Sequence, residues 1–344
     1  MTLTQALEAL SRGERLRTAD LEEILGTLMD GEAPPAQSAA LLMALRMQGE
    51  TASDLIAAAR ALRARATTVP APVAGAVDTC GTGGDGCNTF NISTTVCFVV
   101  AGAGVPVAKH GNRAASSRSG SFDVLEALGV RIDLPVAAAA GLLAEVGIAP
   151  LFAPTAHPAM RHLAPVRREL GIRTLMNCLG PLLNPLGVKH QLVGVFSADL
   201  VEPLASALAA LGCERGLVVH GEDGLDELST TAPNRTASVI AGEVHTRIVD
   251  AEDLGLPRAQ LADLAGGDAS ENAGILRAIL GGESGPRRDI VLLNAAGALW
   301  AAGKASDFKA GIALAAESLD SGAAQAKLGA LVKASQRVGE AIDG

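Results

Sequence analysis

The feature that most constrains the fold is a regular alternation of two kinds of segment after residue 72. Short runs rich in Val and Ile, at 105–108, 192–196, 216–219 and 290–293, alternate with longer stretches rich in Ala and Leu. Short apolar runs of this kind are typical of buried strands, and the longer stretches between them have the composition of helices. The alternation therefore predicts an α/β domain with a mainly parallel sheet.

The residues before this alternation have a different pattern, in which short helices each carry a start signal. One helix is expected to begin near Thr18, and Pro35 suits the first position of a second. Thr51 and Asp54 form a capping-box pattern for a third helix. The segment 67–72 holds two prolines, which oppose both helix and sheet, so it is predicted to be a linker between this helical region and the α/β domain.

Composition excludes several classes of partner. The 344 residues include 28 Lys and Arg against 37 Asp and Glu, a net charge of −9, so no overall positive field attracts nucleic acid or an anionic membrane. One Trp and no Tyr leave no platform for stacking bases. Five cysteines without a C-x-x-C pair, a polar N-terminus and no apolar run of ~18 residues favour a cytoplasmic protein. Any anionic ligand must be bound locally.

The first segment with chemical character is the glycine-rich stretch 78–86, DTCGTGGDG. It matches G-x-G-x-x-G, but a helix does not follow directly and no acid lies ~20 residues on, which disfavours a dinucleotide fold. No Lys-Ser or Lys-Thr follows, so a Walker loop also fails. What remains is a loop whose bare N–H groups can approach a phosphate, followed by a predicted helix start at 91–94 that favours an anion. The alternative is a tight turn with an ordinary helix cap.

The second such segment is 109–121, KHGNRAASSRSGS, after a strand-like run. It combines Lys109, Arg113 and Arg118 with one His, one Asn and four hydroxyls, and holds no apolar residue larger than Ala. Donors at this density suit a multiply charged anion, and a second helix start follows near Ser121. Two donor-rich loops and two helix starts predict a ligand with two phosphate groups. The alternative is a solvated basic loop.

Two further segments supply carboxylates and a cation. Asp226 and Glu227 are adjacent acids after the strand at 216–219, and with a diphosphate site they form a plausible clamp for Mg²⁺, which prefers carboxylate and phosphate oxygens. Taken alone, such a pair is more often ordinary surface. In the segment 157–185 one arginine is a candidate to bind a substrate carboxylate, and the sequence does not say which. The candidates are Arg161, Arg167, Arg168 and Arg173.

Six motifs together carry a family resemblance. They are GTGGDG at 81–86, NIST at 91–94, KHGNRAASS at 109–117, LFAP with HPAM within 151–160, LGPLLNP at 179–185 and DEL at 226–228. Occurring in this order and covering nearly the whole chain, they make it resemble the anthranilate phosphoribosyltransferase family. The resemblance implies an N-terminal helical domain over 1–69, with part of 160–190 packed on it, and an α/β domain over 73–344 of the nucleoside phosphorylase and phosphoribosyltransferase class. It also implies a homodimer and an active site between the domains.

The resemblance further implies an activity. Such an enzyme transfers the phosphoribosyl group of 5-phosphoribosyl 1-pyrophosphate to the amine of anthranilate, with Mg²⁺, in a step of tryptophan biosynthesis. Two alternatives remain at this point. A pyrimidine nucleoside phosphorylase has a similar architecture but different glycine and lysine motifs. A non-catalytic nucleic-acid-binding relative of the same fold is opposed by the net charge of −9.

The resemblance also assigns residues. The phosphoribosyl pyrophosphate site would comprise Gly81, Gly84, Asp85, Thr89, Asn91, Ile92, Ser93, Thr94, Lys109, His110, Gly111, Asn112, Arg113, Ala114, Ala115, Ser116, Ser117 and Ser121. Mg²⁺ would contact Ser93, Asp226 and Glu227, and anthranilate would contact Gly81, Asn112 and Arg167. No side chain is needed as a nucleophile. His110 is a candidate proton acceptor, with a structural or binding role as an equal alternative.

Overall fold

The computed structural model describes residues 1–67, 69, 74–114 and 118–344, so most of the predicted linker lies outside the described residues. The strands are β1 (Val77–Gly81), β2 (Val107–Gly111), β3 (Ile148–Phe152), β4 (His190–Gly194), β5 (Arg215–Gly221), β6 (Asn234–Ile240) and β7 (Glu243–Val249). The helices are α1 (Leu3–Ser11), α2 (Thr18–Met29), α3 (Pro35–Gln48), α4 (Ala52–Arg63), α5 (Ile92–Gly102), α6 (Ser121–Ala127), α7 (Val136–Glu145), α8 (Ala153–Ala156), α9 (Ala164–Leu170), α10 (Val201–Ala210), α11 (Ala269–Leu280), α12 (Pro286–Ala301), α13 (Phe308–Asp320) and α14 (Ala323–Asp343).

The seven strands form one sheet in the order β3-β2-β1-β4-β5-β6-β7. The first five strands in this order are parallel, and β6 and β7 pair antiparallel at the other end. Pro150 lies in β3, an edge strand, where a missing N–H is tolerated. The predicted α/β fold with a mainly parallel sheet is confirmed.

One predicted strand is wrong. The apolar run 290–293 lies inside helix α12, which begins with Pro286 at a first-turn position. This helix is buried along most of its length between the sheet and α13, so nearly all of its positions are apolar and no polar face reveals the helical period. A run of four apolar residues cannot distinguish a buried strand from part of a buried helix.

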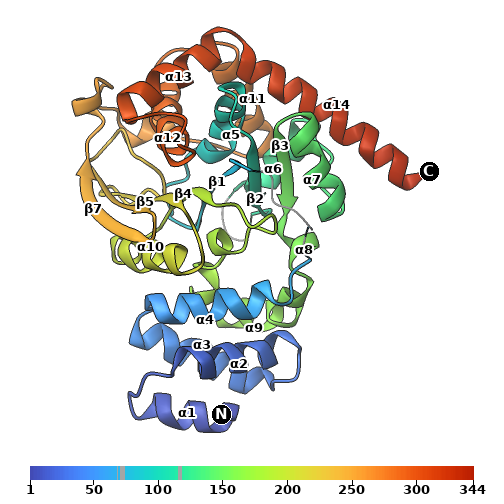
Figure 1. Ribbon diagram of the computed structural model, residues 1–344, viewed down its shortest axis with the longest axis vertical. Helices are drawn as coiled ribbons and strands as arrows, with labels where there is room; N and C mark the ends of the chain where they lie inside the picture. Colours follow the sequence, from blue (N-terminus) through green and yellow to red (C-terminus); the bar gives the residue numbers. More distant parts are fainter. Residues whose placement is uncertain (68, 70–73, 115–117) are drawn as a thin grey trace.

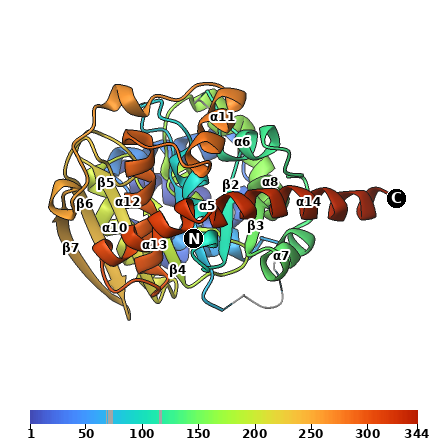
Figure 2. The same ribbon diagram turned by 90° about the horizontal axis from the view of Figure 1, so that it is seen from above.

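Helices cover both faces of the sheet (Figures 1 and 2). One face is covered by α5, α7 and α12, with α13 and α14 packed outside them. The other face is covered by α10, below which α1 to α4 form a helical bundle at the opposite end of the molecule from α13 (Figure 1). No helix in the described ranges is long and apolar enough to cross a membrane.

The bundle follows the predicted start signals. Pro35 is the first residue of α3, and Thr51 and Asp54 form a reciprocal capping box at the start of α4. Helix α2 begins at Thr18, but Arg17 is its N-cap residue and makes no side-chain cap, so Thr18 marks the helix start without capping it.

The bundle and the lower face of the sheet share one apolar core. Buried side chains of α1 to α4 pack in a single cluster with residues of 163–183, of α10 and of β4 to β6. Arg63, at the end of α4, donates from Nε to the carbonyl of Leu182 at 2.8 Å and from Nη1 to that of Leu211 at 3.3 Å. The segment 163–183 thus packs against the bundle, although it lies in the chain between β3 and β4.

Candidate active site

The predicted motifs meet at the carboxyl ends of the parallel strands. Strand β1 pairs with β2 on one side and with β4 on the other, so the connections from β1 and β4 run in opposite directions along the sheet. Open α/β sheets bind ligands in the crevice at such a switch point. The glycine-rich loop follows β1, the basic loop follows β2 and the adjacent acids follow β5.

The two acids contact the two predicted phosphate-binding elements directly. The N–H of Gly83 donates to Oδ2 of Asp226 at 2.7 Å, and the N–H of Ser93, in the first turn of α5, donates to Oε1 of Glu227 at 3.1 Å. A Cβ on Gly81 would lie 2.4 Å from Oδ2 of Asp226, so this approach requires glycine. The sequence-predicted phosphate and metal residues therefore converge.

Burial and mutual repulsion act on both acids. Loss of solvent raises the pKa of Asp226 well above its usual range, and the charges of Glu227 and Asp85 raise it further. Loss of solvent also raises the pKa of Glu227, although Lys109 and the N–H of Ser93 oppose that shift. Acids held together in this way favour a neighbouring cation.

These residues fit Mg²⁺. No group of three or more His, Cys, Asp or Glu side chains arranged for a metal ion occurs within the described ranges. Mg²⁺ is commonly held by one or two carboxylates together with substrate phosphates, and its charge would offset the repulsion that raises the two pKa values. The pair Asp226 and Glu227 meets that requirement.

Lys109 lies beneath the crevice as a buried cation. Its Nζ donates to the carbonyl of Thr79 at 2.6 Å and lies 3.4 Å from Oγ of Ser93. A buried ammonium needs negative charge nearby, and Lys109 lowers the pKa of both Glu227 and Asp78. Lys109 therefore places positive charge next to the start of α5.

A buried polar network joins β1, β2 and the segment after 183. Asp78 accepts hydrogen bonds from the N–H of His110 at 3.2 Å and from Nδ2 of Asn184 at 2.9 Å. Asn184 also donates to the carbonyl of Ala108 at 2.8 Å. Burial raises the pKa of Asp78, and these donors and Lys109 oppose the shift. The network fixes the end of β2 against β1.

His110 is a neutral imidazole. Burial lowers its pKa to about 3, and its Nδ1 lies 3.1 Å from the carbonyl of Gly180, which assigns the proton to Nδ1 and leaves Nε2 as an acceptor. Its ring meets His157 edge-on at 5.1 Å between centroids, and burial lowers the pKa of His157 to about 4.

The loop after β2 is only partly described, because 115–117 lie outside the described residues. Arg113 is paired with Glu126 of α6 at 2.7 Å and with Asp123 at 3.2 Å, so its charge is already compensated. The carbonyl of Asn112 accepts a hydrogen bond from the hydroxyl of Ser121 at 3.3 Å. Residues 112–114 are thus held against α6 by hydrogen bonds.

Arg167 stands apart from these loops. It lies on α9, which packs against α3 of the bundle, and its side chain is half-buried. Burial lowers the pKa of its guanidinium, and no carboxylate of the described residues pairs with it. No described contact joins it to Gly81 or Asn112, so the structure leaves the predicted anthranilate residues on two separate parts of the fold.

Two neighbours of the site lie outside the residues that the resemblance assigns to it, although Arg173 is one of the four candidate arginines and only the segment 264–272 was missed. The guanidinium of Arg173 stacks over the ring of Phe196 at 4.3 Å and lies against Gly84, where a Cβ would be 2.2 Å from Nη2. The segment 264–272 runs beside 88–91, with Thr89 bridged to Ala265. In the sequence, the two adjacent glycines at 266–267 before the start of a helix are a weak indication that this segment approaches another part of the backbone closely.

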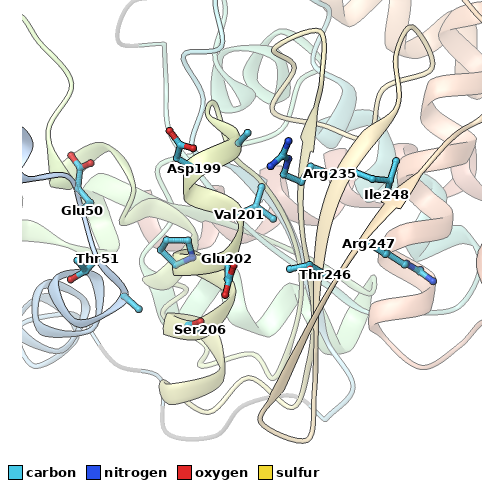
Figure 3. Close-up of a pocket in the computed structure, with 13 residues that line it drawn as sticks. Glu50, Thr51, Asp199, Val201, Glu202, Ser206, Arg235, Thr246, Arg247 and Ile248 are labelled. Carbon is cyan, nitrogen blue, oxygen red and sulfur yellow. The ribbon is translucent and has the colours of Figure 1, made fainter.

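A groove of about 820 Å³ lies elsewhere, between the start of α4, α10 and strands β6 and β7 (Figure 3). Asp199, Glu202, Arg235 and Arg247 contribute charged side chains of both signs. It contains none of the predicted site residues. Its volume therefore does not make this groove the candidate site, and the predicted residues converge instead at the carboxyl ends of β1 and β4.

Comparisons with known proteins show the family of the whole chain. Residues 74–325 match the model of the glycosyl transferase family, a/b domain, and residues 4–66 match its helical bundle domain. The anthranilate phosphoribosyltransferase of Moorella thermoacetica is 55% identical over 93% of this chain and 94% of its own.

Solved structures of two such proteins are also similar. The enzyme from Thermus thermophilus has a TM-score of 0.91 at 45% identity, covering 96% of this chain and 99% of its own. The one from Saccharomyces cerevisiae, in complex with PRPP and Mg, has a TM-score of 0.88 at 28% identity, covering 97% and 98%. Because the identity is high over nearly the full length of both chains, this chain belongs to the anthranilate phosphoribosyltransferase family.

Proposed function

We propose that this protein transfers the phosphoribosyl group of 5-phosphoribosyl 1-pyrophosphate to the amine of anthranilate, forming N-(5-phosphoribosyl)anthranilate and pyrophosphate in tryptophan biosynthesis. The observation that carries the proposal is the convergence of three motifs, in which the acids after β5 accept hydrogen bonds from the glycine loop and from the start of α5. The names of the similar proteins support the same substrates.

The residues of the crevice would hold the diphosphate. The N–H groups of the glycine loop and of the first turn of α5 other than those of Gly83 and Ser93, which donate to the acids, are suited to phosphate oxygens, and Lys109 places its charge beside them. Ser93, Asp226 and Glu227 would hold Mg²⁺, whose positive charge would offset the negative charge of the pyrophosphate group. No residue has to form a covalent bond, because positioning and electrostatic stabilisation are sufficient for this transfer.

The acceptor would be oriented from the bundle side. Arg167, with no described carboxylate partner, is suited to bind the carboxylate of anthranilate, together with Gly81 and Asn112. A pKa of about 3 makes His110 a weak base at neutral pH, and its Nε2 is buried with no hydrogen-bond partner among the described residues, so a structural role fits this histidine better than proton transfer. The assignment of a proton acceptor stays a prediction.

The test is the loss of anthranilate fluorescence on adding the protein, phosphoribosyl pyrophosphate and Mg²⁺. Decay that needs every component supports the proposal, and Arg167→Ala is expected to raise the KM for anthranilate at least tenfold with little change in that for phosphoribosyl pyrophosphate. Arg168→Ala, an exposed neighbour, is the matched control. Phosphorolysis of thymidine or uridine instead would favour a nucleoside phosphorylase, and a salt-sensitive gel shift would favour nucleic-acid binding.

We also propose domain boundaries at 1–69 and 73–344, a homodimer formed through the helical domain, and a cytoplasmic location. The matched ranges 4–66 and 74–325 support the boundaries. Exposed Met43 and Met47 on α3 offer apolar surface for a dimer, which light scattering would detect. All five cysteines are free thiols, as suits a reducing compartment.

A further inference from the structure

The side chain of Asn91 is held at both ends by other parts of the chain. Asn91 is the N-cap residue of α5, but its side chain makes no cap hydrogen bond to that helix. Its Nδ2 donates to the carbonyl of Ser119 at 3.3 Å, and its Oδ1 accepts from Nδ2 of Asn272 at 2.8 Å. The amide is therefore oriented by tertiary contacts and not by its own helix.

The side-chain amide of Asn272, on α11, is fixed in one orientation, with its nitrogen facing Asn91. It is 3% exposed, and its Oδ1 accepts a hydrogen bond from the N–H of Gly267 at 2.8 Å. Because that oxygen faces an N–H donor, the amide nitrogen faces Asn91. Asn91 must then direct its oxygen to Asn272 and its nitrogen to Ser119, which fixes the direction of its remaining lone pair and its second N–H.

The backbone around Asn272 is anchored to the loop that precedes α5. Phe90 donates its N–H to the carbonyl of Leu264 at 3.1 Å, and Gly266 donates to the carbonyl of Asn88 at 3.0 Å. A Cβ on Gly266 would lie 2.6 Å from the backbone of Phe90, so the glycine permits this spacing. The segment 264–272 therefore lies against the loop that precedes α5, and its Gly267 and Asn272 line a small hollow together with residues 88–89 and 118–119.

We infer that Asn272 is a positioning residue for phosphoribosyl pyrophosphate, acting through Asn91; the inference rests on the proposed function, in which Asn91 contacts that substrate. Asn272 fixes which atoms of the Asn91 amide face the ligand. Without it, that amide can rotate, and the substrate has to bind a side chain that is no longer pre-oriented.

The first experiment measures binding of phosphoribosyl pyrophosphate by titration calorimetry, with Mg²⁺ and without acceptor. Asn272→Ala removes the contact, whereas Asn272→Asp keeps the oxygen that faces Gly267 and replaces the donor to Asn91 by a second oxygen. Both are expected to raise the Kd roughly tenfold, the effect of about one hydrogen bond. The KM for anthranilate should change less than twofold. The control is Asp268→Ala, which removes the N-cap of the same helix, a 2.9 Å bond to the N–H of Glu271, without touching Asn91.

A double-mutant cycle supplies the decisive comparison. If Asn272 acts through Asn91, Asn272→Ala adds less than twofold to the Kd in an Asn91→Ala background. The inference is overturned if the effects of Asn91→Ala and Asn272→Ala on the Kd multiply. It is also overturned if Asp268→Ala weakens binding of phosphoribosyl pyrophosphate as much as Asn272→Ala at an equal loss of Tm. A wild-type protein that binds phosphoribosyl pyrophosphate but does not consume anthranilate would refute the proposed function alone, because the cycle is measured without acceptor.

Discussion

The end of β4 lies against the backbone of Asp226, so one added methyl group tests whether the position of this acid matters apart from its charge. A Cβ on Gly194 would lie 1.5 Å from the carbonyl oxygen of Asp226 and 2.4 Å from its carbonyl carbon. Ordinary contacts of this kind are about 3.5 Å, so the backbone of Asp226 has to move by about 2 Å. Strand β4 is paired on both sides, so the loop that carries Asp226 is the part that yields.

Two effects follow in Gly194→Ala. Overpacking lowers the free energy of unfolding by about 1–3 kcal/mol. Since misplacement by about 1 Å can cost about 100-fold in rate, we expect kcat/KM to fall at least about 100-fold. The assay is the decay of anthranilate fluorescence, with unfolding by urea measured in parallel. Gly141→Ala is the control, because a Cβ in this helix meets nothing within 4 Å. A folded Gly194→Ala protein with kcat/KM within threefold of wild type would refute the reasoning.

Three further predictions test charge, pH and capping. The double change Asp226→Asn, Glu227→Gln should abolish Mg²⁺-dependent turnover yet raise Tm, because it removes two buried carboxylates whose pKa values are raised. The folded-state pKa values of about 3 for His110 and about 4 for His157 lie below the ordinary 6.5, so the unfolded chain takes up protons first and Tm should fall as pH drops from about 6.5 to 4. His157→Gln should make this fall of Tm with pH less steep. An equally steep fall in the variant would contradict the lowered pKa of His157. Thr51→Ala should lower the free energy of unfolding by about 1 kcal/mol in urea titrations, with no change in KM.

Features that depend on neighbouring residues were predictable from the sequence. The capping box at Thr51 follows from local hydrogen bonding, and the strands near 107, 192 and 216 follow from short β-branched runs. The helix start at 91–94 was predicted as well, although the side chain of Asn91 makes no cap hydrogen bond there. The strand predicted at 290–293 was wrong because a helix that is buried on all sides lacks the polar face that would reveal its period.

Features that depend on distant residues were not predictable in the same way. Asn272 is 181 positions from Asn91, and no local pattern marks it as a partner. Arg113 is suited by its charge to a phosphate, but in the structure it pairs with Glu126 on the helix that follows. A cation in a basic loop can meet an acid or a ligand, and only the folded chain shows which acids are within reach.

The connection between β3 and β4 explains why the two substrates would meet where they do. After β3, at the sheet edge, the chain leaves the sheet, passes through α9 against the bundle, and returns beneath β1 and β2 before entering β4 on the far side of β1 (Figure 1). This excursion creates the switch point that opens the crevice. It also carries Arg167 to the bundle and Asn184 to the buried Asp78. The same stretch of chain therefore shapes the crevice proposed to bind the diphosphate and carries the cation proposed to orient the acceptor, so in this proposal the bundle contributes to the site as well as to the core.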